Sequence, residues 1–234
     1  MRKNKVMRLA SGLLVAVPLT TSVISGTFAK YTTSANGSDT ARVADCGVYA
    51  TVTGNVFKTE YDRTDTSYTN TSTTVVSSTT DKLVAPGTNG TFGGLALSGS
   101  PEVATRVSFD GTEVNLTGWL LSDGTTYYCP IEFNINGDII KGIDYSNEVA
   151  LETAIYNAIV KGKGDYAPNT DLVSIDALVG EYTWNWAYET GDTNAEKAEN
   201  NVKDTDLANL EAVSDSIDVN TITITVVTTI TQID

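Results

Sequence analysis

The sequence predicts a mainly β fold, a β-sandwich interrupted by one or two short helical insertions. Thr, Val, Ile, Tyr and Ser dominate, with frequent Gly and Asn, a composition that favours strands and turns. Two runs, residues 182–188 and 221–233, alternate in side-chain type along their length. The dipeptide Asn136-Gly137 between two apolar runs is typical of a type I′ hairpin turn.

The first strand is expected at residues 44–53, where Val48, Ala50 and Val52 alternate with polar positions and form a half-buried face. Further strands are expected at residues 73–77, 91–97, 103–109, 126–133 and 134–140. We expect residues 91–97 to pair with residues 103–109 across the turn between them. Residues 60–80 are rich in Thr, Ser and Asp, which predicts a long, mobile surface loop.

The two alternating runs predict the strongest strands. In the first, one face carries four aromatic side chains: Tyr182, Trp184, Trp186 and Tyr188. We interpret this face as core packed against an opposite sheet, and a sugar-stacking strip is the alternative. The second run, residues 221–233, is expected to be one of the longest strands, with Ile222, Ile224, Val226, Thr228, Ile230 and Gln232 on one side.

Two helical insertions interrupt the strands. Ser146 is the expected N-cap of a helix that ends before Gly162. Its apolar stripe at helical spacing consists of Leu151, Ile155, Ala158 and Ile159. A weaker helical pattern covers residues 194–212, as two stretches around an acidic linker.

The first 29 residues predict a cleaved export signal. A basic segment containing Arg2 and Arg8 precedes the apolar residues 9–19, and Thr27 and Ala29 are small enough for signal peptidase pockets. Cleavage between Ala29 and Lys30 would leave a polar arm, residues 30–43, ahead of a single domain at residues 44–234. A free, extendable arm can pair with something outside its own fold, and the mature protein is expected outside the cell, with no membrane attachment.

Charge and residue inventory exclude several classes of function. Removing the four cationic residues of the signal leaves 11 Lys and Arg against 29 Asp and Glu, a net charge of −18. This charge argues against nucleic acid or anionic lipid as a partner. The absence of histidine removes Ser-His-Asp and Cys-His catalytic sites and histidine-containing zinc sites. We therefore expect no enzyme, no cofactor and no metal.

Two features leave alternatives open. Cys46 and Cys129 could form one disulfide in an exported protein, or remain two separate buried cysteines. Acidic pairs could bind Ca²⁺, although none follows a spaced calcium loop, and solvated loop charge is the favoured interpretation. These pairs are Asp62 with Asp65, Asp204 with Asp206, and Asp215 with Asp218.

Several segments resemble the TasA and camelysin proteins of Gram-positive bacteria, which are exported through a dedicated signal peptidase, SipW. The junction SGTFAKYTT at residues 25–33 and GSDTARVA at residues 37–44 carry the first part of this resemblance. The later segments are LVAPGTNG at residues 83–90, YTWNWAYE at residues 182–189, DTDLANL at residues 204–210, and the terminal run ending TQID.

The resemblance implies a two-sheet, jelly-roll-like domain that polymerises into extracellular biofilm-matrix or cell-surface fibres. The arm freed by signal cleavage would insert as a missing strand into the next copy of the chain, a donor-strand form of β-augmentation. Such head-to-tail contacts do not close on themselves and build filaments. The candidate donor residues are Lys30, Tyr31, Thr32, Thr33, Ser34 and Ala35.

The expected function is therefore a secreted structural fibre subunit whose partners are other copies of itself and, during export, a signal peptidase. One alternative is a monomeric surface adhesin that binds a glycan or a protein through its loops. A secreted metallopeptidase, the activity attached to camelysin, is disfavoured because the chain lacks histidine and an HExxH motif.

Overall fold

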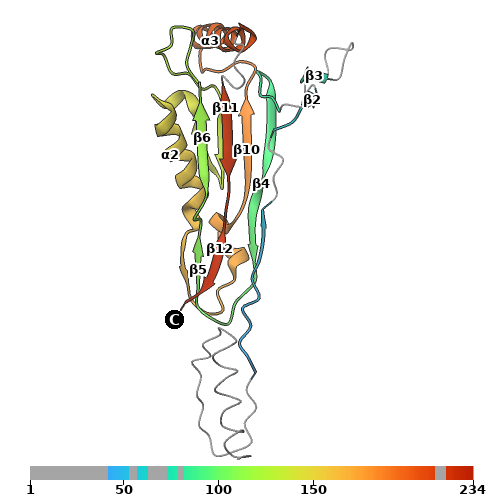
Figure 1. Cartoon of the computed structure of the whole chain (residues 1–234), viewed down its shortest axis with the longest axis vertical. Coiled ribbons are helices and arrows are strands. Elements are labelled where there is room, and N and C mark those ends of the chain that lie inside the picture. The colour runs from blue at the N-terminus through green and yellow to red at the C-terminus, as the bar shows by residue number, and fades with distance from the viewer. Residues whose placement is uncertain (1–41, 53–56, 63–72, 79–81, 214–219, 234) are drawn as a thin grey trace, which may run out of the picture. The chain divides into compact units, whose positions relative to one another are not determined.

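The computed structural model describes residues 42–52, 57–62, 73–78, 82–213 and 220–233. The predicted export signal, its cleavage point between Ala29 and Lys30, and the candidate donor residues 30–35 lie outside the described residues. Residues Asp45–Asp234 form one compact unit. This unit is mainly β, with several antiparallel sheets and two α-helices (Figure 1).

The largest sheet has five antiparallel strands in the order β1-β4-β10-β7-β8. They are β1 (Tyr49–Val52), β4 (Thr88–Ser98), β10 (Val179–Trp186), β7 (Glu132–Ile135) and β8 (Asp138–Lys141). The predicted hairpin at β7–β8 is confirmed, because Asn136 and Gly137 both adopt the positive φ of a type I′ turn, at 53° and 84°.

The remaining strands form three smaller antiparallel sheets, ordered β12-β5-β9, β11-β6 and β2-β3. They are β2 (Glu60–Asp62), β3 (Thr73–Val76), β5 (Thr105–Ser108), β6 (Glu113–Thr117), β9 (Gly164–Tyr166), β11 (Thr221–Thr225) and β12 (Thr229–Gln232). Since β5 continues into β6 and β11 into β12, the pairs β5–β12 and β6–β11 follow one another along the molecule (Figure 1).

The expected pairing of residues 91–97 with residues 103–109 is wrong. Both segments are strands, but β4 is flanked by β1 and β10, whereas β5 is flanked by β12 and β9. The connection between them passes Gly99, whose φ of 119° is accessible mainly to glycine. It therefore carries the chain from one sheet to another instead of closing a hairpin.

The C-terminal run is two strands and not one. Residues 226–228 leave the ladder between β11 and β12, opposite the turn that joins β5 to β6. Thr112 holds this break: its buried hydroxyl donates to the carbonyl of Val227 at 3.1 Å and accepts from the amide of Val227 at 2.9 Å. The predicted faces persist through the break, because Ile222 and Ile230 lie opposite Leu116 and Val107.

The two α-helices lie near the predicted positions. Helix α2 (Glu148–Ile159) buries the expected Leu151, Ile155, Ala158 and Ile159, but its N-cap is Asn147, whose side chain accepts from the amide of Ala150, and not Ser146. Helix α3 (Asn194–Val213) is continuous, whereas two stretches were expected. The described chain also contains short 3-10 helices: η1 (Gly142–Asp144), η2 (Val160–Gly162), η3 (Leu172–Ser174) and η4 (Asp176–Leu178).

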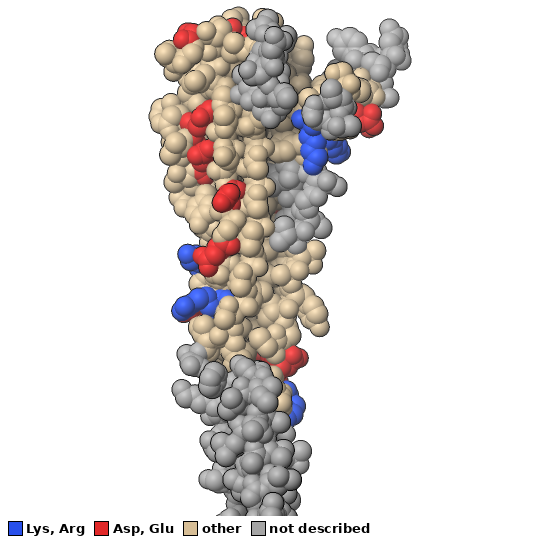
Figure 2. Space-filling view, viewed as in Figure 1, with Lys and Arg blue, Asp and Glu red and all other residues tan. Residues whose placement is uncertain are grey.

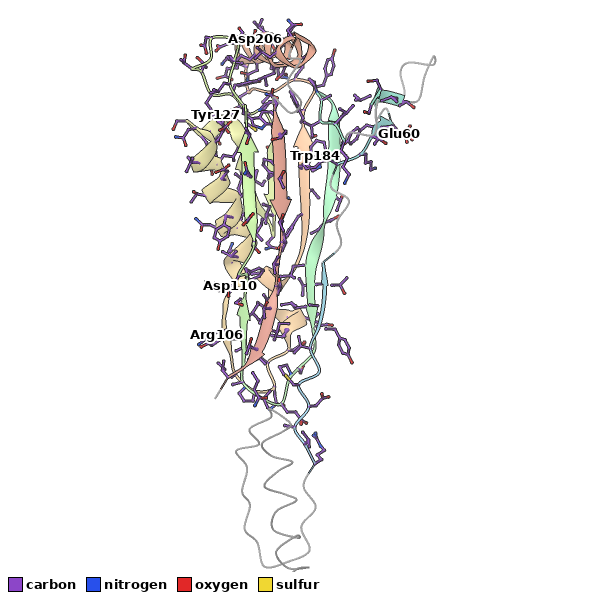
Figure 3. All side chains as sticks on the ribbon, in the orientation of Figure 1. Glu60, Arg106, Asp110, Tyr127, Trp184 and Asp206 are labelled. Atoms are coloured by element: carbon purple, nitrogen blue, oxygen red, sulfur yellow. The ribbon has the colours of Figure 1, made fainter. Side chains whose placement is uncertain are left out.

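One hydrophobic core cluster joins the sheets and both α-helices. The aromatic face of β10 supplies much of it, since Trp184, labelled in Figure 3, is 1% exposed and Trp186 is 5% exposed. The rings of Trp119 and Trp186 lie 6.2 Å apart, and those of Phe57 and Trp184 lie 5.3 Å apart. The core interpretation of this face is confirmed for residues 182, 184 and 186.

Tyr188, the fourth aromatic residue, lies beyond the end of β10 and is 75% exposed. The expected loop at residues 60–80 is wrong in part, because its described residues include the β2–β3 hairpin. Tyr61 of β2 is buried, packs edge-on against Trp184, and donates its hydroxyl to the carbonyl of Leu83 at 2.8 Å. Residues 63–72 and 79–81 lie outside the described chain.

Candidate functional site

Sheet edges are the places where a β protein can accept another strand, because their backbone groups on one side lack a strand partner. On the outer side of β6 this possibility is closed by α2. Glu152 accepts a hydrogen bond from the amide of Leu116 at 2.7 Å, and Glu148 accepts one from the amide of Trp119 at 2.9 Å. Two carboxylates of one helix thus take the place of a strand.

The other short edges offer little length for pairing. The edge strands β1, β8 and β9 span only four, four and three residues. On β8, Asp138 also forms an ion pair with Lys161 at 2.8 Å, which ties that edge to the segment after α2. A long pairing surface requires a different edge.

The edge formed by β11 and β12 is that surface. Within the described residues, each of these strands has a hydrogen-bonded neighbour on one side only, β6 for β11 and β5 for β12. Together with the three residues between them, they cover twelve residues from Thr221 to Gln232.

Burial along this edge differs between the two strands of each pair. Val107 and Leu116, on the inner side, are 0% and 3% exposed. Their partners Ile230 and Ile222, which face the same core, are only half-buried. The half-buried side chains of this edge form one apolar row, called here the edge stripe: Ile222, Ile224, Val226 and Ile230. The core is thus incompletely covered along β11 and β12.

The opposite side of the same strands is polar and uncharged. Thr223, Thr225, Thr229 and Thr231 are exposed. Residues 221–233 contain no charged side chain, and the surface over β11 and β12 is correspondingly uncharged in Figure 2. In a chain with 29 acidic residues, an uncharged run of this length avoids electrostatic repulsion against a partner of the same kind.

The chain enters the compact unit at a fixed point. The amide of Asp45 donates to Glu102 at 2.9 Å, and the amide of Glu102 donates back to the carbonyl of Asp45 at 2.8 Å. Gly47 passes so close to Gly99 that a Cβ on Gly99 would overlap the Gly47 carbonyl oxygen. Residues 45–48 are therefore fastened to the connection between β4 and β5.

The end of β12 lies at this same connection, because the amide of Ile233 donates to the carbonyl of Ala104 at 2.9 Å. Helix α3 lies at the other end of the compact unit, near the start of β11 (Figure 1). The chain's entry point and the end of the open edge are thus together, and the start of the edge lies at the α3 end.

The two cysteines do not meet. Both are free thiols, so the disulfide does not form; the alternative of two separate buried cysteines holds for Cys129, which is fully buried, and is wrong for Cys46, which is exposed. Burial raises the pKa of the Cys129 thiol to about 12, which keeps it protonated and unreactive at neutral pH.

Of the three acidic pairs, only Asp204 and Asp206 are both described. The described residues contain no group of three or more Cys, Asp or Glu side chains that could hold a metal ion. Asp204 is a buried residue of α3, whereas the side chain of Asp206 accepts a hydrogen bond from the amide of Ser122 at 2.7 Å. Asp65, Asp215 and Asp218 lie outside the described residues. Among the described helices, none has both the length and the apolar character needed to cross a bilayer.

A pocket of about 570 Å³ lies between the outer face of the five-stranded sheet and the first turns of α3. Three residues directly opposite one another on adjacent strands line it: Asn185, Glu132 and Lys141. Tyr127, Tyr128 and Tyr145 also line it. Neither this pocket nor the open edge was predicted from the sequence as a site, because both depend on which strands become neighbours.

Comparisons of this chain with protein-family models, with curated proteins and with solved structures gave no match.

Proposed function

We propose that this protein is a secreted structural subunit of an extracellular fibre, in which the N-terminal arm of one copy adds a strand to the β11–β12 edge of the next. The single observation that carries the proposal is the edge stripe, an apolar row left half-buried on an edge beside which the described residues place no further strand. An added strand would complete both the backbone ladder and the cover of the core.

The proposal includes a two-sheet, jelly-roll-like sandwich. Its support is the shared core: Phe133 of β7 and Leu95 of β4 lie in the same cluster as Val107 of β5 and Leu116 of β6. In such a sandwich, β11 and β12 form the edge of the smaller layer, and a missing strand beside them exposes the interior. The segments that resemble TasA and camelysin proteins support the same architecture.

The arm and the edge are similar in length. Residues 30–43 comprise fourteen residues and the edge comprises twelve, spans of about 46 Å and about 40 Å at ~3.3 Å per residue in extended conformation. Alternate residues of the arm, Tyr31, Thr33 and Ala35, would face the edge stripe. The arm carries no proline and its only charges are Lys30, Asp39 and Arg42.

The direction of pairing supports a head-to-tail chain of subunits. All strand pairs among the described residues are antiparallel, so we propose the same for the added strand. The C-terminal end of the arm would then lie beside Thr221, near the α3 end of the acceptor. In its own subunit, that end of the arm leads to Asp45 at the opposite end. The contact is heterologous and does not close.

Magnitudes are compatible with a stable joint. About six added backbone hydrogen bonds at about 1 kcal/mol each give about 6 kcal/mol. A few newly buried side chains at about 1.5–3 kcal/mol each add a similar amount. The opposing loss of freedom on association is about 4–15 kcal/mol. Concentration and avidity along the fibre would then decide its length.

The proposal is tested with the mature chain and two variants of the edge. Ile224→Asp places a charge in the edge stripe, and Thr223→Asp is the matched control on the exposed face of the same strand. In negative-stain microscopy we expect filaments from the mature chain and from Thr223→Asp, and none from Ile224→Asp or from a chain lacking residues 30–40.

A mixing experiment separates loss of assembly from loss of folding. The Ile224→Asp chain retains its arm but lacks a competent edge, whereas the arm-deleted chain has the edge alone. Mixed together, they should form heterodimers that grow no further, measurable by light scattering coupled to size exclusion. Filaments from the arm-deleted chain alone would overturn the proposal.

The pocket beneath α3 favours a second candidate, a monomeric surface module that binds a glycan or protein. Three tyrosines together with Asn185 and Glu132 are residue types that suit a polyhydroxylated ligand. Such a module would stay monodisperse, would keep its ligand after deletion of residues 30–40, and would lose it in Glu132→Gln. A hydrolase that depends on histidine finds no support in this pocket, because the chain contains no histidine.

A further inference from the structure

Helix α3 docks through one face that mixes apolar and polar side chains. Asn200, Asp204 and Leu207 recur at helical spacing, and Asp204 and Leu207 are 4% and 3% exposed. Leu207 belongs to the hydrophobic core cluster. Asn200 reaches the loop before the helix, where its side-chain amide donates to the carbonyl of Thr190 at 2.8 Å. A carboxyl group thus lies in the middle of a buried helix interface.

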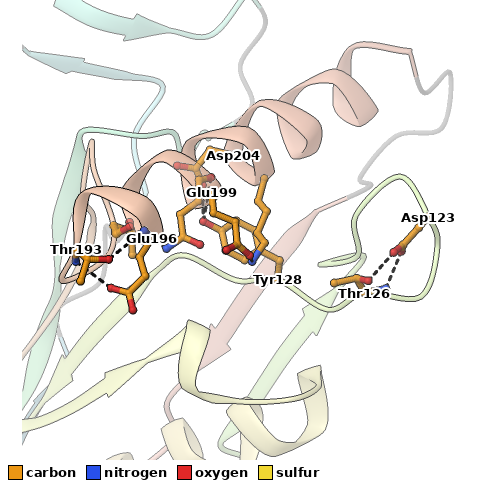
Figure 4. Close-up of polar contacts among 10 residues, drawn as sticks. Asp123, Thr126, Tyr128, Thr193, Glu196, Glu199 and Asp204 are labelled. Carbon is orange, nitrogen blue, oxygen red and sulfur yellow. Dashed lines mark hydrogen bonds and ion pairs between the residues drawn. The ribbon is translucent and has the colours of Figure 1, made fainter.

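Asp204 has only partial hydrogen-bonding satisfaction there. Its Oδ1 accepts from the hydroxyl of Tyr128 at 3.0 Å (Figure 4). Its Oδ2 is buried with no hydrogen-bond partner among the described residues, and the same holds for the indole Nε1 of Trp186. The indole nevertheless lies close enough to favour the charged carboxylate. A buried carboxylate with one full hydrogen bond is costly when ionised.

The groups around Asp204 do not neutralise its charge. From the β6–β7 connection it faces the phenol of Tyr128, which is neutral near pH 7 because burial raises its pKa. From β10 it faces the indole of Trp186. On α3 itself, Lys203 lies over the Tyr128 ring, 5.5 Å from its centre, and forms its ion pair with Glu199 at 2.7 Å. No described cation forms a salt bridge with Asp204.

We propose that Asp204, Tyr128 and Trp186 form a proton-dependent clasp that holds α3 more tightly when Asp204 is protonated. Burial raises the pKa of this carboxyl above its ordinary 3.8, only partly offset by Tyr128 and Trp186. The docked helix therefore binds the proton more strongly than the undocked helix. The added stability is complete below the ordinary pKa and is lost as the pH rises through the raised one.

A second carboxyl on the same helix sets the lower limit of this range. Glu196 accepts from the amides of Thr193 and Asp192, at 2.9 and 3.0 Å, and these bonds lower its pKa below the ordinary 4.5. Its capping contribution is present above that ordinary value and fades as the pH falls through the lowered one. The helix is thus held best at mildly acidic pH.

The clasp is also relevant to strand β11, because only a short segment that includes residues 214–219 separates α3 from β11 along the chain. It does not depend on the proposed assembly, and its test needs no filament. Hydrogen exchange of the α3 amides, corrected for intrinsic rates, is measured from pH 4.5 to 7.5 on the chain lacking residues 30–40. We expect the opening constant of α3 to rise several-fold across this range, by at most about tenfold per pH unit.

Asp204→Asn removes the titrating group and should abolish the pH dependence of the α3 opening constant, whatever it does to the absolute rate of exchange. Asp206→Asn is the matched control on the same helix and should keep the slope. Tyr128→Phe keeps the Asp204 carboxyl buried but removes the hydroxyl that donates to it. The pH dependence of α3 opening should therefore persist and shift to higher pH. Exchange of β4 and β10 amides reports global folding.

The proposed clasp would be overturned if Asp204→Asn left the pH dependence of the α3 opening constant unchanged. It would also be overturned if the opening constant of wild-type α3 did not depend on pH. If Asp204→Asn exposes the β4 and β10 amides, Tyr128→Phe decides the question by the position of its slope. Filament formation plays no part in these outcomes.

Discussion

The indole Nε1 of Trp119 donates to the carbonyl of Thr221 at 3.0 Å, joining the end of β6 to the first residue of β11. Trp119 is 1% exposed and also packs on Trp186, so one side chain fixes the start of the open edge and fills the core beneath it.

We expect Trp119→Phe to lower the free energy of unfolding by about 2–3 kcal/mol. The change removes the donor to the half-buried carbonyl of Thr221 and leaves a cavity beside Trp186. Urea unfolding measures the loss. Tyr188→Phe, at a side chain that is 75% exposed, should shift stability by less than about 0.5 kcal/mol, and an equal loss in both variants would contradict this assignment.

The entry point of the chain predicts a contrast between two glycines with positive φ. A methyl group on Gly99 would overlap the carbonyl oxygen of Gly47, whereas one on Gly124 would meet nothing within 4 Å. Gly99→Ala should therefore lower the free energy of unfolding by about 2–4 kcal/mol, and Gly124→Ala by about 1 kcal/mol, the backbone strain alone. Thermal unfolding of the two variants side by side checks the difference.

The separated cysteines predict selective labelling. In the folded protein one thiol per chain should react with a disulfide reagent at pH 8, because Cys46 is exposed while Cys129 is buried with its pKa raised to about 12. In urea two thiols should react. Cys46→Ser should leave none in the folded state, and rapid labelling of that variant would show that Cys129 is accessible.

The capping role of Glu196 predicts a pH dependence of opposite sign to that of Asp204. Glu196→Gln should raise hydrogen exchange in the first turn of α3 at pH 7, where the native carboxylate is ionised and its pKa is lowered by the Thr193 and Asp192 amides. At a pH well below 4.5 the two proteins should converge. Glu199→Gln, one turn along, is the control and should leave the first turn unchanged.

The export signal predicts the N-terminus of the mature protein. Intact mass and N-terminal sequencing of material collected from the medium should place Lys30 first, since Thr27 and Ala29 are the small residues before the cut. A bulky residue in Ala29→Leu should block cleavage and leave uncleaved precursor. A mature chain beginning elsewhere would change which residues form the arm.

The sequence predicts local structure well wherever one residue pattern decides it. Asn136-Gly137 determines a two-residue turn by its backbone preference alone, and the alternation of Tyr182, Trp184 and Trp186 leaves a single buried face. Leu151 and Ile155 likewise mark the inner side of α2. In each case the side-chain pattern and the backbone preference favour the same local structure.

Pairing between distant segments is harder to predict. The sequence around Gly99 is compatible with a hairpin, and only the competition of β1 and β10 for the edges of β4 excludes it. The open edge is hard to predict for the same reason. In the sequence Ile222 and Ile224 resemble ordinary core residues, and they are half-buried because no second strand lies beside β11 among the described residues. Asp204 was identified only as one member of an acidic pair, because its burial depends on where α3 docks.

The break at residues 226–228, held by Thr112 and Val227, has a consequence for solubility. Two straight, uninterrupted edges stack readily on one another and propagate into aggregates. Here the ladder is divided into runs of five and four residues, so an arbitrary strand finds only short stretches of regular backbone to pair with. The protein can thus leave twelve residues of sheet margin uncovered while discouraging indiscriminate stacking.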